Sequence, residues 1–268
     1  MKLSISNIAW PAQSEREVFS LLHGLGVRGV EVAPTRLWPE WDAGPQEAAA
    51  YRAKLAQEGI ACSSLQAVLF GKPELRLFAD AAARVALLEH LTRVADIAAA
   101  LGAGPMVFGA PRNRDRGALS DEAAFDIAVE FFKLVGEKCA ARGVCLCIEP
   151  NPEVYACNFV TRSDQGARLV RAVGSPGFRL HLDAAGMHLA GEDAVQAINA
   201  AADVLEHVHI SEPQLGDFSS PQVDHHALAR ALRSIGWKKW MAIEMKETRQ
   251  PLADVRTALE RATELYGA

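Results

Sequence analysis

Short apolar runs alternate with longer Ala- and Leu-rich stretches along the whole chain. This alternation is typical of βαβ units built around a parallel sheet. A Gly precedes most of the runs, as in ALGAGPMVF and ARGVCLC, where it can end the preceding helix in the left-handed conformation. The strands are predicted at Leu3–Ile8, Val30–Val32, Ala61–Leu65, Met106–Phe108, Val144–Ile148, Phe178–Leu182, His207–Ile210 and Met241–Ile243. Eight such repeats predict a (β/α)₈ TIM barrel of the α/β class.

The length supports the same architecture. The chain has 268 residues, close to the roughly 250 that are typical of one (β/α)₈ barrel. We therefore predict a single domain over residues 1–268. Among the intervening helices, those that follow Ser120 and Ser163 are predicted to begin with these residues as N-caps.

Composition excludes several classes of function. The formal net charge of −5 argues against a nucleic-acid partner, because binding to phosphates needs a surplus of Lys and Arg. The five cysteines are odd in number and are expected to be reduced and mostly buried. The first residues lack the features of a secretory signal, and no apolar run approaches 18 residues. We expect a cytoplasmic protein with no membrane segment.

Four side chains that can bind a metal lie at the carboxyl ends of the later apolar runs. They are Glu149 in CLCIEP, Asp183 in FRLHLD, His209 in LEHVHI and Glu244 in WMAIEM. The carboxyl ends of barrel strands converge on one face, where the active site is built. Three carboxylates and one imidazole suit a single divalent ion such as Mn²⁺, Co²⁺, Mg²⁺ or Zn²⁺. The sequence therefore predicts a metal-dependent enzyme.

Such a site suits the removal of a proton from a carbon beside a carbonyl. That reaction needs a base and stabilisation of the enolate oxygen, and a metal supplies the second. Proton transfer by a positioned Glu contributes about 10²–10⁴-fold. The expected substrate is a small carbohydrate with a carbonyl group.

The segments EPNP, HLD, HVHISEP and AIEM together resemble the sugar phosphate isomerase/epimerase family of xylose isomerase-like TIM barrels, including ketose epimerases of the D-tagatose 3-epimerase type. The similarity extends along nearly the whole chain. It implies that Glu149, Asp183, His209 and Glu244 hold one divalent metal. It also implies that Glu149 and Glu244 are catalytic, one removing a proton and the other returning it on the opposite face. Barrels of this family often pair, so a homodimer is also expected.

Two positions depart from the ketose epimerases. A substrate-binding His three residues after the metal-binding Asp is replaced by Gly186, and the expected Arg after the metal-binding His is replaced by Leu215. These changes leave open a lyase or dehydratase acting on a keto-sugar or keto-inositol, because an enolate can also expel a β-substituent. An abasic-site endonuclease and a non-catalytic binding barrel are weaker alternatives.

Polar residues on the loops at the same face are candidates for substrate binding. The candidates are His188, Glu212, Arg112 and Lys246, and Arg114 is an alternative to Arg112 in PRNRDRG. His181 and His207 share the strand parity of the predicted ligands and are expected to lie in the core or behind the ligands. Trp38 and Trp41 lie in a long loop that can roof the pocket, pack on a helix or contribute to an interface.

Overall fold

Each predicted apolar run forms one barrel strand in the computed structural model, which describes residues 1–267. The strands are β1 (Lys2–Ser6), β2 (Gly29–Val32), β3 (Ala61–Leu65), β4 (Pro105–Phe108), β5 (Cys145–Ile148), β6 (Phe178–Asp183), β7 (Leu205–Ser211) and β8 (Trp240–Glu244). Every neighbouring pair is parallel, and β8 pairs with β1 to close the barrel. The predicted (β/α)₈ fold is thus confirmed.

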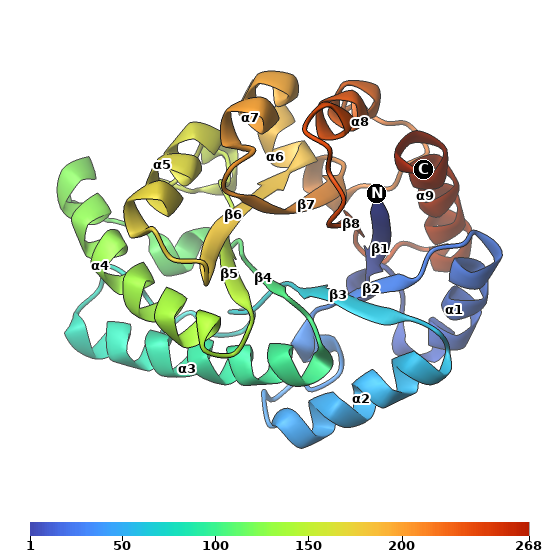
Figure 1. Ribbon diagram of the computed structural model, residues 1–268, viewed down its shortest axis with the longest axis horizontal. Coiled ribbons are helices and arrows are strands. Elements are labelled where there is room, and N and C mark those ends of the chain that lie inside the picture. The colour runs from blue at the N-terminus through green and yellow to red at the C-terminus, as the bar shows by residue number, and fades with distance from the viewer. Residues whose placement is uncertain (268) are drawn as a thin grey trace.

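Helices form a ring around the strands (Figure 1). They are α1 (Glu15–Gly24), α2 (Pro45–Gln57), α3 (Ala81–Leu101), α4 (Asp121–Ala140), α5 (Ser163–Val173), α6 (Ala184–Leu189), α7 (Ala194–Ala201), α8 (His225–Ser234) and α9 (Pro251–Tyr266). Short 3₁₀ turns at Asn7–Ala9, Ala12–Ser14, Pro34–Arg36, Pro111–Arg114, Glu153–Tyr155 and Pro213–Leu215 lie in the loops. Gly102 directly follows α3, and its φ of 75° is the left-handed conformation predicted for these glycines.

The apolar core lies between the strands and the helices. All residues of β2, β4 and β5 are buried, as expected for parallel strands that are covered on both faces. Phe132 of α4 stacks on Phe178 of β6 with ring centroids 4.4 Å apart. The inner side of the barrel instead buries polar groups, among them Glu31, Ser64, His181 and His207. Buried polar groups need hydrogen-bond partners, and Glu31 bonds to both Ser64 and His207 in this interior.

Two predicted boundaries are wrong in informative ways. Strand β1 ends at Ser6, because its hydroxyl accepts the Ile8 amide (3.4 Å) and turns the chain into a 3₁₀ helix. Ser163 is the first residue of α5, whose N-cap is Arg162. Ser120 does cap α4, accepting the Ala123 amide at 3.2 Å.

The two loop tryptophans pack on helices. Trp41 lies edge-on to His90 of α3 at 4.8 Å, and Trp38 lies edge-on to Tyr51 of α2 at 6.3 Å. All five cysteines are buried and free. Among residues 1–267, no helix combines the length and apolar character needed to cross a membrane.

Candidate metal and active site

The four predicted metal ligands come together at the carboxyl ends of consecutive strands. Glu149 directly follows β5, Asp183 ends β6, His209 lies near the end of β7 and Glu244 ends β8. Asp183 and His209 are register partners across β6 and β7. All four side chains line one cavity of about 830 Å³. The barrel topology therefore brings together residues that are far apart in the sequence.

The donor atoms are close enough to share an ion. One donor atom from each of Asp183, His209 and Glu244 lies within 4.8 Å of the others, and the same holds for Glu149, His181 and Asp183. Asp183 joins the two groups. His181 was not predicted as a ligand; it is fully buried and neither ring nitrogen has a hydrogen-bond partner within residues 1–267. Burial, followed by the neighbouring His209 and His207, lowers the pKa of His181 well below its usual range, so its ring is neutral.

The contact between His209 and Glu244 tests whether the site suits a cation. His209 Nδ1 lies 3.2 Å from Glu244 Oε2, yet Nδ1 makes no hydrogen bond within residues 1–267. Burial opposes a charged ring, but Glu31 and Glu244 together raise the pKa of His209 well above its usual range. The negative charges of Glu31 and Glu244 thus favour a positive centre at His209, and either a proton on Nδ1 or a bound cation beside Nδ1 can supply it. These residues therefore fit a divalent metal.

Glu31 on β2 orients His209 from the opposite side and was missed in the sequence analysis. Its carboxylate is fully buried and accepts from His207 Nε2 (2.9 Å), His209 Nε2 (3.1 Å) and the Ser64 hydroxyl (2.7 Å). Burial raises its pKa, but the combined effect of His209 and His207 lowers it by more. The pKa of Glu31 therefore lies well below its usual range. An ionised Glu31 places the His209 proton on Nε2. Nδ1 is thereby the nitrogen that faces the site, and its lone pair becomes available to a metal when the metal displaces the Nδ1 proton.

Replacing Glu31 by Gln is expected to weaken binding of Mn²⁺ by about 10–100-fold, the usual cost of losing the partner of a metal-binding His. The amide can donate as well as accept, so it no longer enforces one His209 tautomer. Isothermal titration of the metal-free protein measures the affinity. Glu17→Gln, at an exposed position on α1, is the matched control and should bind Mn²⁺ like the wild type. Unchanged affinity in Glu31→Gln would contradict the orienting role.

The carboxylates of the predicted ligand set are so close together that ionising all of them is unfavourable. Burial and then the charges of Asp183 and Glu244 raise the pKa of Glu149 to about 8. Burial and the charge of Glu244 raise the pKa of Asp183 to about 6. Three crowded carboxylates in mutual repulsion are stabilised by a cation that binds them all.

This electrostatic arrangement predicts how pH affects the stability of the protein in the presence of a chelator. The pKa of Glu149 is higher in the folded protein than its ordinary value of 4.5, so the protonated form is favoured by folding. Its contribution to stability is complete below about pH 4.5 and is lost as the pH rises through about 8. Metal binding needs the ionised ligands and tightens over the same range.

We therefore expect the shift in melting temperature on adding Mn²⁺ to grow as the pH rises towards about 8. Differential scanning calorimetry with Mn²⁺ and with chelator checks this. A shift that is constant over this range would contradict a site made of crowded carboxylates.

The Asp183 carboxylate is held by its own loop. Gly186 donates its backbone N–H to Oδ1 at 2.6 Å, and the Ser211 hydroxyl donates to Oδ2. Gly186 is the position at which the resemblance to ketose epimerases led us to expect a substrate-binding His. A Cβ atom there would lie 3.2 Å from Asp183 Oδ1. The residue thus caps Asp183 closely and offers the substrate no side chain.

Arg114 is a structural residue, which corrects the suggestion that it binds substrate. It is fully buried and donates to the carbonyl oxygens of Phe159 (3.0 Å), Phe108 (3.0 Å) and Glu149 (2.6 Å). A further bond goes to Asn151 Oδ1 at 2.8 Å. With its donors directed to these acceptors, Arg114 ties the loop after β4 to the backbone that carries Glu149.

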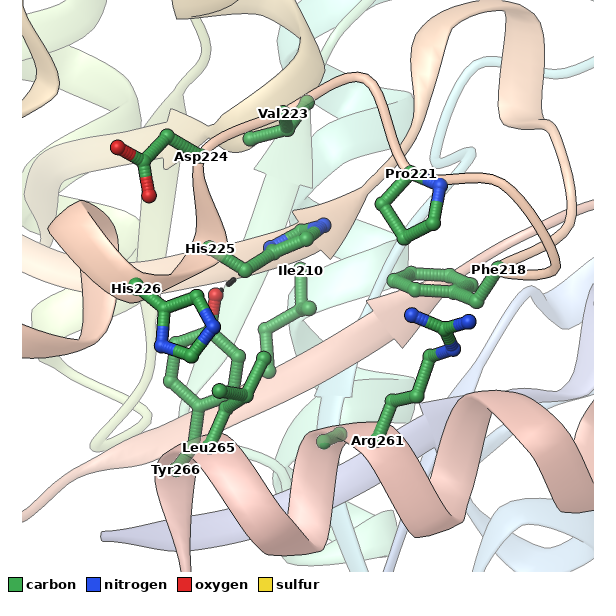
Figure 2. A pocket seen from close by; sticks show the side chains of 11 residues that line it. Ile210, Phe218, Pro221, Val223, Asp224, His225, His226, Arg261, Leu265 and Tyr266 are labelled. Atoms are coloured by element: carbon green, nitrogen blue, oxygen red, sulfur yellow. Dashed lines mark hydrogen bonds between the residues drawn. The ribbon is translucent and has the colours of Figure 1, made fainter.

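Glu212 lines the cavity, but both of its oxygens are engaged by its own surroundings. Oε1 pairs with His225 Nε2 at 2.8 Å, and Oε2 accepts a hydrogen bond from the backbone N–H of Gln222 at 2.8 Å. His225 Nδ1 in turn meets the Tyr266 hydroxyl at 2.7 Å (Figure 2). This chain of hydrogen bonds anchors the loop before α8. The adjoining cavity in Figure 2 has a volume of about 130 Å³, below the roughly 300–1,000 Å³ of typical ligand pockets.

The other candidates for substrate binding are divided between the cavity and the surface. Arg112 is exposed and lines the cavity, as does Leu215 at the position where an Arg was expected. His188 is exposed on α6, and Lys246 is exposed with its ammonium 3.2 Å from the Gln214 carbonyl. Neither is among the residues that line the cavity. The structure thus brings Arg112 and Glu212, but not His188 or Lys246, to the predicted ligands.

Comparison with known proteins agrees with this geometry. A family model described as xylose isomerase-like TIM barrel matches residues 19–265. A segment of 110 residues is 30% identical to an L-ribulose 3-epimerase of Mesorhizobium japonicum; the segment covers 41% of this chain and 37% of that relative.

Solved structures share the fold over the whole chain. D-psicose 3-epimerase with D-tagatose from Clostridium cellulolyticum H10 has a TM-score of 0.83 at 16% identity, with 100% of each chain covered. The IOLI protein with a binding zinc atom has a TM-score of 0.77 at 16% identity, with 99% of this chain and 98% of that chain covered. At these identities, the similarity concerns the architecture.

Proposed function

The chain belongs to the xylose isomerase-like TIM barrel family, and we propose that it is a divalent-metal-dependent epimerase or isomerase of a keto-sugar or related polyol. The observation that carries this proposal is the convergence of Glu149, Asp183, His209 and Glu244 on one cavity. The Nδ1 atom of His209 and repelling carboxylates at the same point suit a metal that displaces the Nδ1 proton. The same carboxylates suit proton transfer at carbon.

In this proposal, Glu149 and Glu244 exchange a proton with the carbon beside the substrate carbonyl. One removes it from one face, and the other returns a proton on the opposite face. A bound divalent ion would polarise the carbonyl as a Lewis acid. Asp183, held by Gly186 and Ser211, and His209, held by Glu31, keep the ligand set in place. Their role is to orient, whereas the two glutamates move protons.

The relatives support the substrate class. The curated relative is an L-ribulose 3-epimerase, and the structural neighbour is a D-psicose 3-epimerase with D-tagatose. Both names denote epimerases that act next to a ketose carbonyl. We infer a small carbohydrate as the substrate in this chain as well, with Mn²⁺, Co²⁺, Mg²⁺ or Zn²⁺ as the cofactor and without a nucleic-acid partner. A homodimer remains a prediction.

The decisive experiment is turnover of a panel of ketoses and keto-inositols in D₂O by metal-reconstituted protein. We expect deuterium to enter recovered or isomeric sugar at the carbon beside the carbonyl, detected by NMR and mass spectrometry. Protein treated with chelator is the control and should show no exchange. Absence of exchange with every member of the panel would reject the proposal for these substrates.

A lyase or dehydratase is the second candidate, and one feature of the cavity favours keeping it. Gly186 and Leu215 occupy the positions of a His and an Arg that the ketose epimerases use, and Leu215 lines the cavity. Without these two polar side chains, the protein has fewer contacts to hold the substrate. The same enolate can then expel a β-substituent. A product lighter than the substrate by one water in the same assay would identify this reaction.

A further inference from the structure

The cavity extends well beyond the four predicted ligands, and apolar residues from three loops line part of it. Its volume of about 830 Å³ lies towards the upper end of the roughly 300–1,000 Å³ that accommodate drug-sized ligands. Loops after β3, β4 and β7 contribute an apolar wall, which consists of Ala67, Phe70, Pro73, Ala110, Pro111 and Leu215. Polar side chains of the same loops, Lys72, Arg112 and Gln214, also line the cavity. Sugar hydroxyls need such polar partners, whereas the apolar wall suits an apolar group of a ligand.

Phe70 is the most exposed part of this wall. Phe70 is 66% exposed, although it lines the cavity. Single exposed apolar residues are ordinary on protein surfaces, but Phe70 shares the lining of this cavity with the five other apolar residues of the wall. Ala67, with a φ of 53°, accepts the Phe70 amide at 2.9 Å, so a tight turn presents the ring.

The backbone of this loop is fixed from behind. The Trp41 indole donates to the Phe70 carbonyl at 3.0 Å, and His90 Nε2 lies 2.8 Å from the Val68 carbonyl. Asn113 donates its side-chain amide to the Lys72 carbonyl at 2.7 Å. These bonds hold the backbone of the loop in place, so the position from which the Phe70 side chain extends is fixed.

We propose that the apolar wall is a subsite for an apolar aglycone, so that the substrate is a keto-glycoside with an aromatic or alicyclic group. This inference rests on the proposed function for the sugar half of the ligand. The wall and the carboxylates belong to one continuous cavity, so a single molecule spans both. The sugar lies over Glu149 and Glu244, and its aglycone packs against Phe70.

The test compares binding of phenyl and methyl glycosides of the same sugar. Phenyl and methyl β-D-glucopyranoside, galactopyranoside and xylopyranoside are titrated calorimetrically into the Mn²⁺-loaded enzyme. These glycosides lack the carbonyl that the proposed chemistry needs, so binding is measured without turnover. At least one phenyl glycoside should bind about tenfold or more tightly than its methyl counterpart, because it covers Phe70 with an aromatic contact.

Two variants link the preference to the wall. Phe70→Ala should remove the preference for phenyl, and Leu134→Ala, which truncates a half-exposed apolar residue of α4, should keep it. Equal affinities within every pair, no binding of any phenyl glycoside, or a preference that survives in Phe70→Ala would each overturn the proposal. Sedimentation that shows a dimer dissociated by Phe70→Ala, with no phenyl preference, would assign this face to a second copy instead.

The outcome is separable from that of the proposed function. A phenyl preference without deuterium exchange into any keto-sugar or keto-glycoside would retain the subsite and reject the sugar chemistry. Exchange into free ketoses without any phenyl preference would retain the chemistry and reject the subsite.

Discussion

Replacement of Glu244 by Gln is expected to lower kcat/KM by about 10²–10⁴-fold, the contribution of a positioned acid or base. Gln cannot accept a proton from carbon, and its neutral oxygen is a weaker metal ligand. Because Glu244 ends β8 and its side chain is only partly buried, the fold should tolerate this isosteric change. Turnover is to be measured at saturating Mn²⁺, which separates the loss of the proton-transfer group from weaker metal binding.

Glu247→Gln is the matched control, since Glu247 lies on the same loop and makes an exposed ion pair with Arg36 at 3.1 Å. Exposed pairs contribute little to stability, so this variant should retain wild-type activity. Turnover in Glu244→Gln near the wild-type rate would remove Glu244 from the proposed proton transfer in both the epimerase and the lyase mechanisms.

Gly109→Ala is expected to lower kcat by about 10²-fold, because an added Cβ would overlap the Glu149 carboxylate. A misplacement of a catalytic group by roughly 1 Å can have this effect. Glu149 has a flexible side chain and can move aside, so the variant should fold and melt close to the wild type. Steady-state kinetics together with calorimetry would show activity lost without a comparable loss of stability.

Gly104→Ala is the control for this substitution. A Cβ atom at Gly104 would meet no atom within 4 Å, so its activity and melting temperature should remain unchanged. Full activity in Gly109→Ala would mean that the position of Glu149 seen here is not needed for the reaction.

Much of the fold and the candidate ligand set follow from the linear pattern. The alternation of apolar runs with helical stretches placed every strand, with errors confined to boundaries such as Ser6, where a side-chain hydrogen bond to the backbone redirected the chain. The convergence of Glu149, Asp183, His209 and Glu244 was predictable because parallel strands in a barrel end on one face. Their roles as ligands and bases remain proposals.

The supporting residues could not be predicted in this way. Glu31 lies 178 residues before His209 and meets it across the barrel; only the charge inside the strand sequence GVEV hinted at it. Arg114 resembled a substrate-binding Arg in its loop, but three-dimensional packing directed its donors to backbone carbonyls. His188 and Lys246 follow predicted strands closely, yet their side chains are exposed.

The sequence by itself determined the barrel and the carboxyl-end residues, because hydrophobic periodicity and strand direction are local properties with a fixed geometric consequence. Tertiary structure alone decided which nitrogen of His209 faces the site, which glycine makes room for Glu149 and where Phe70 is exposed. These features depend on contacts between residues brought together by barrel closure, and the directions of side chains across a barrel are not encoded in the spacing along any one strand.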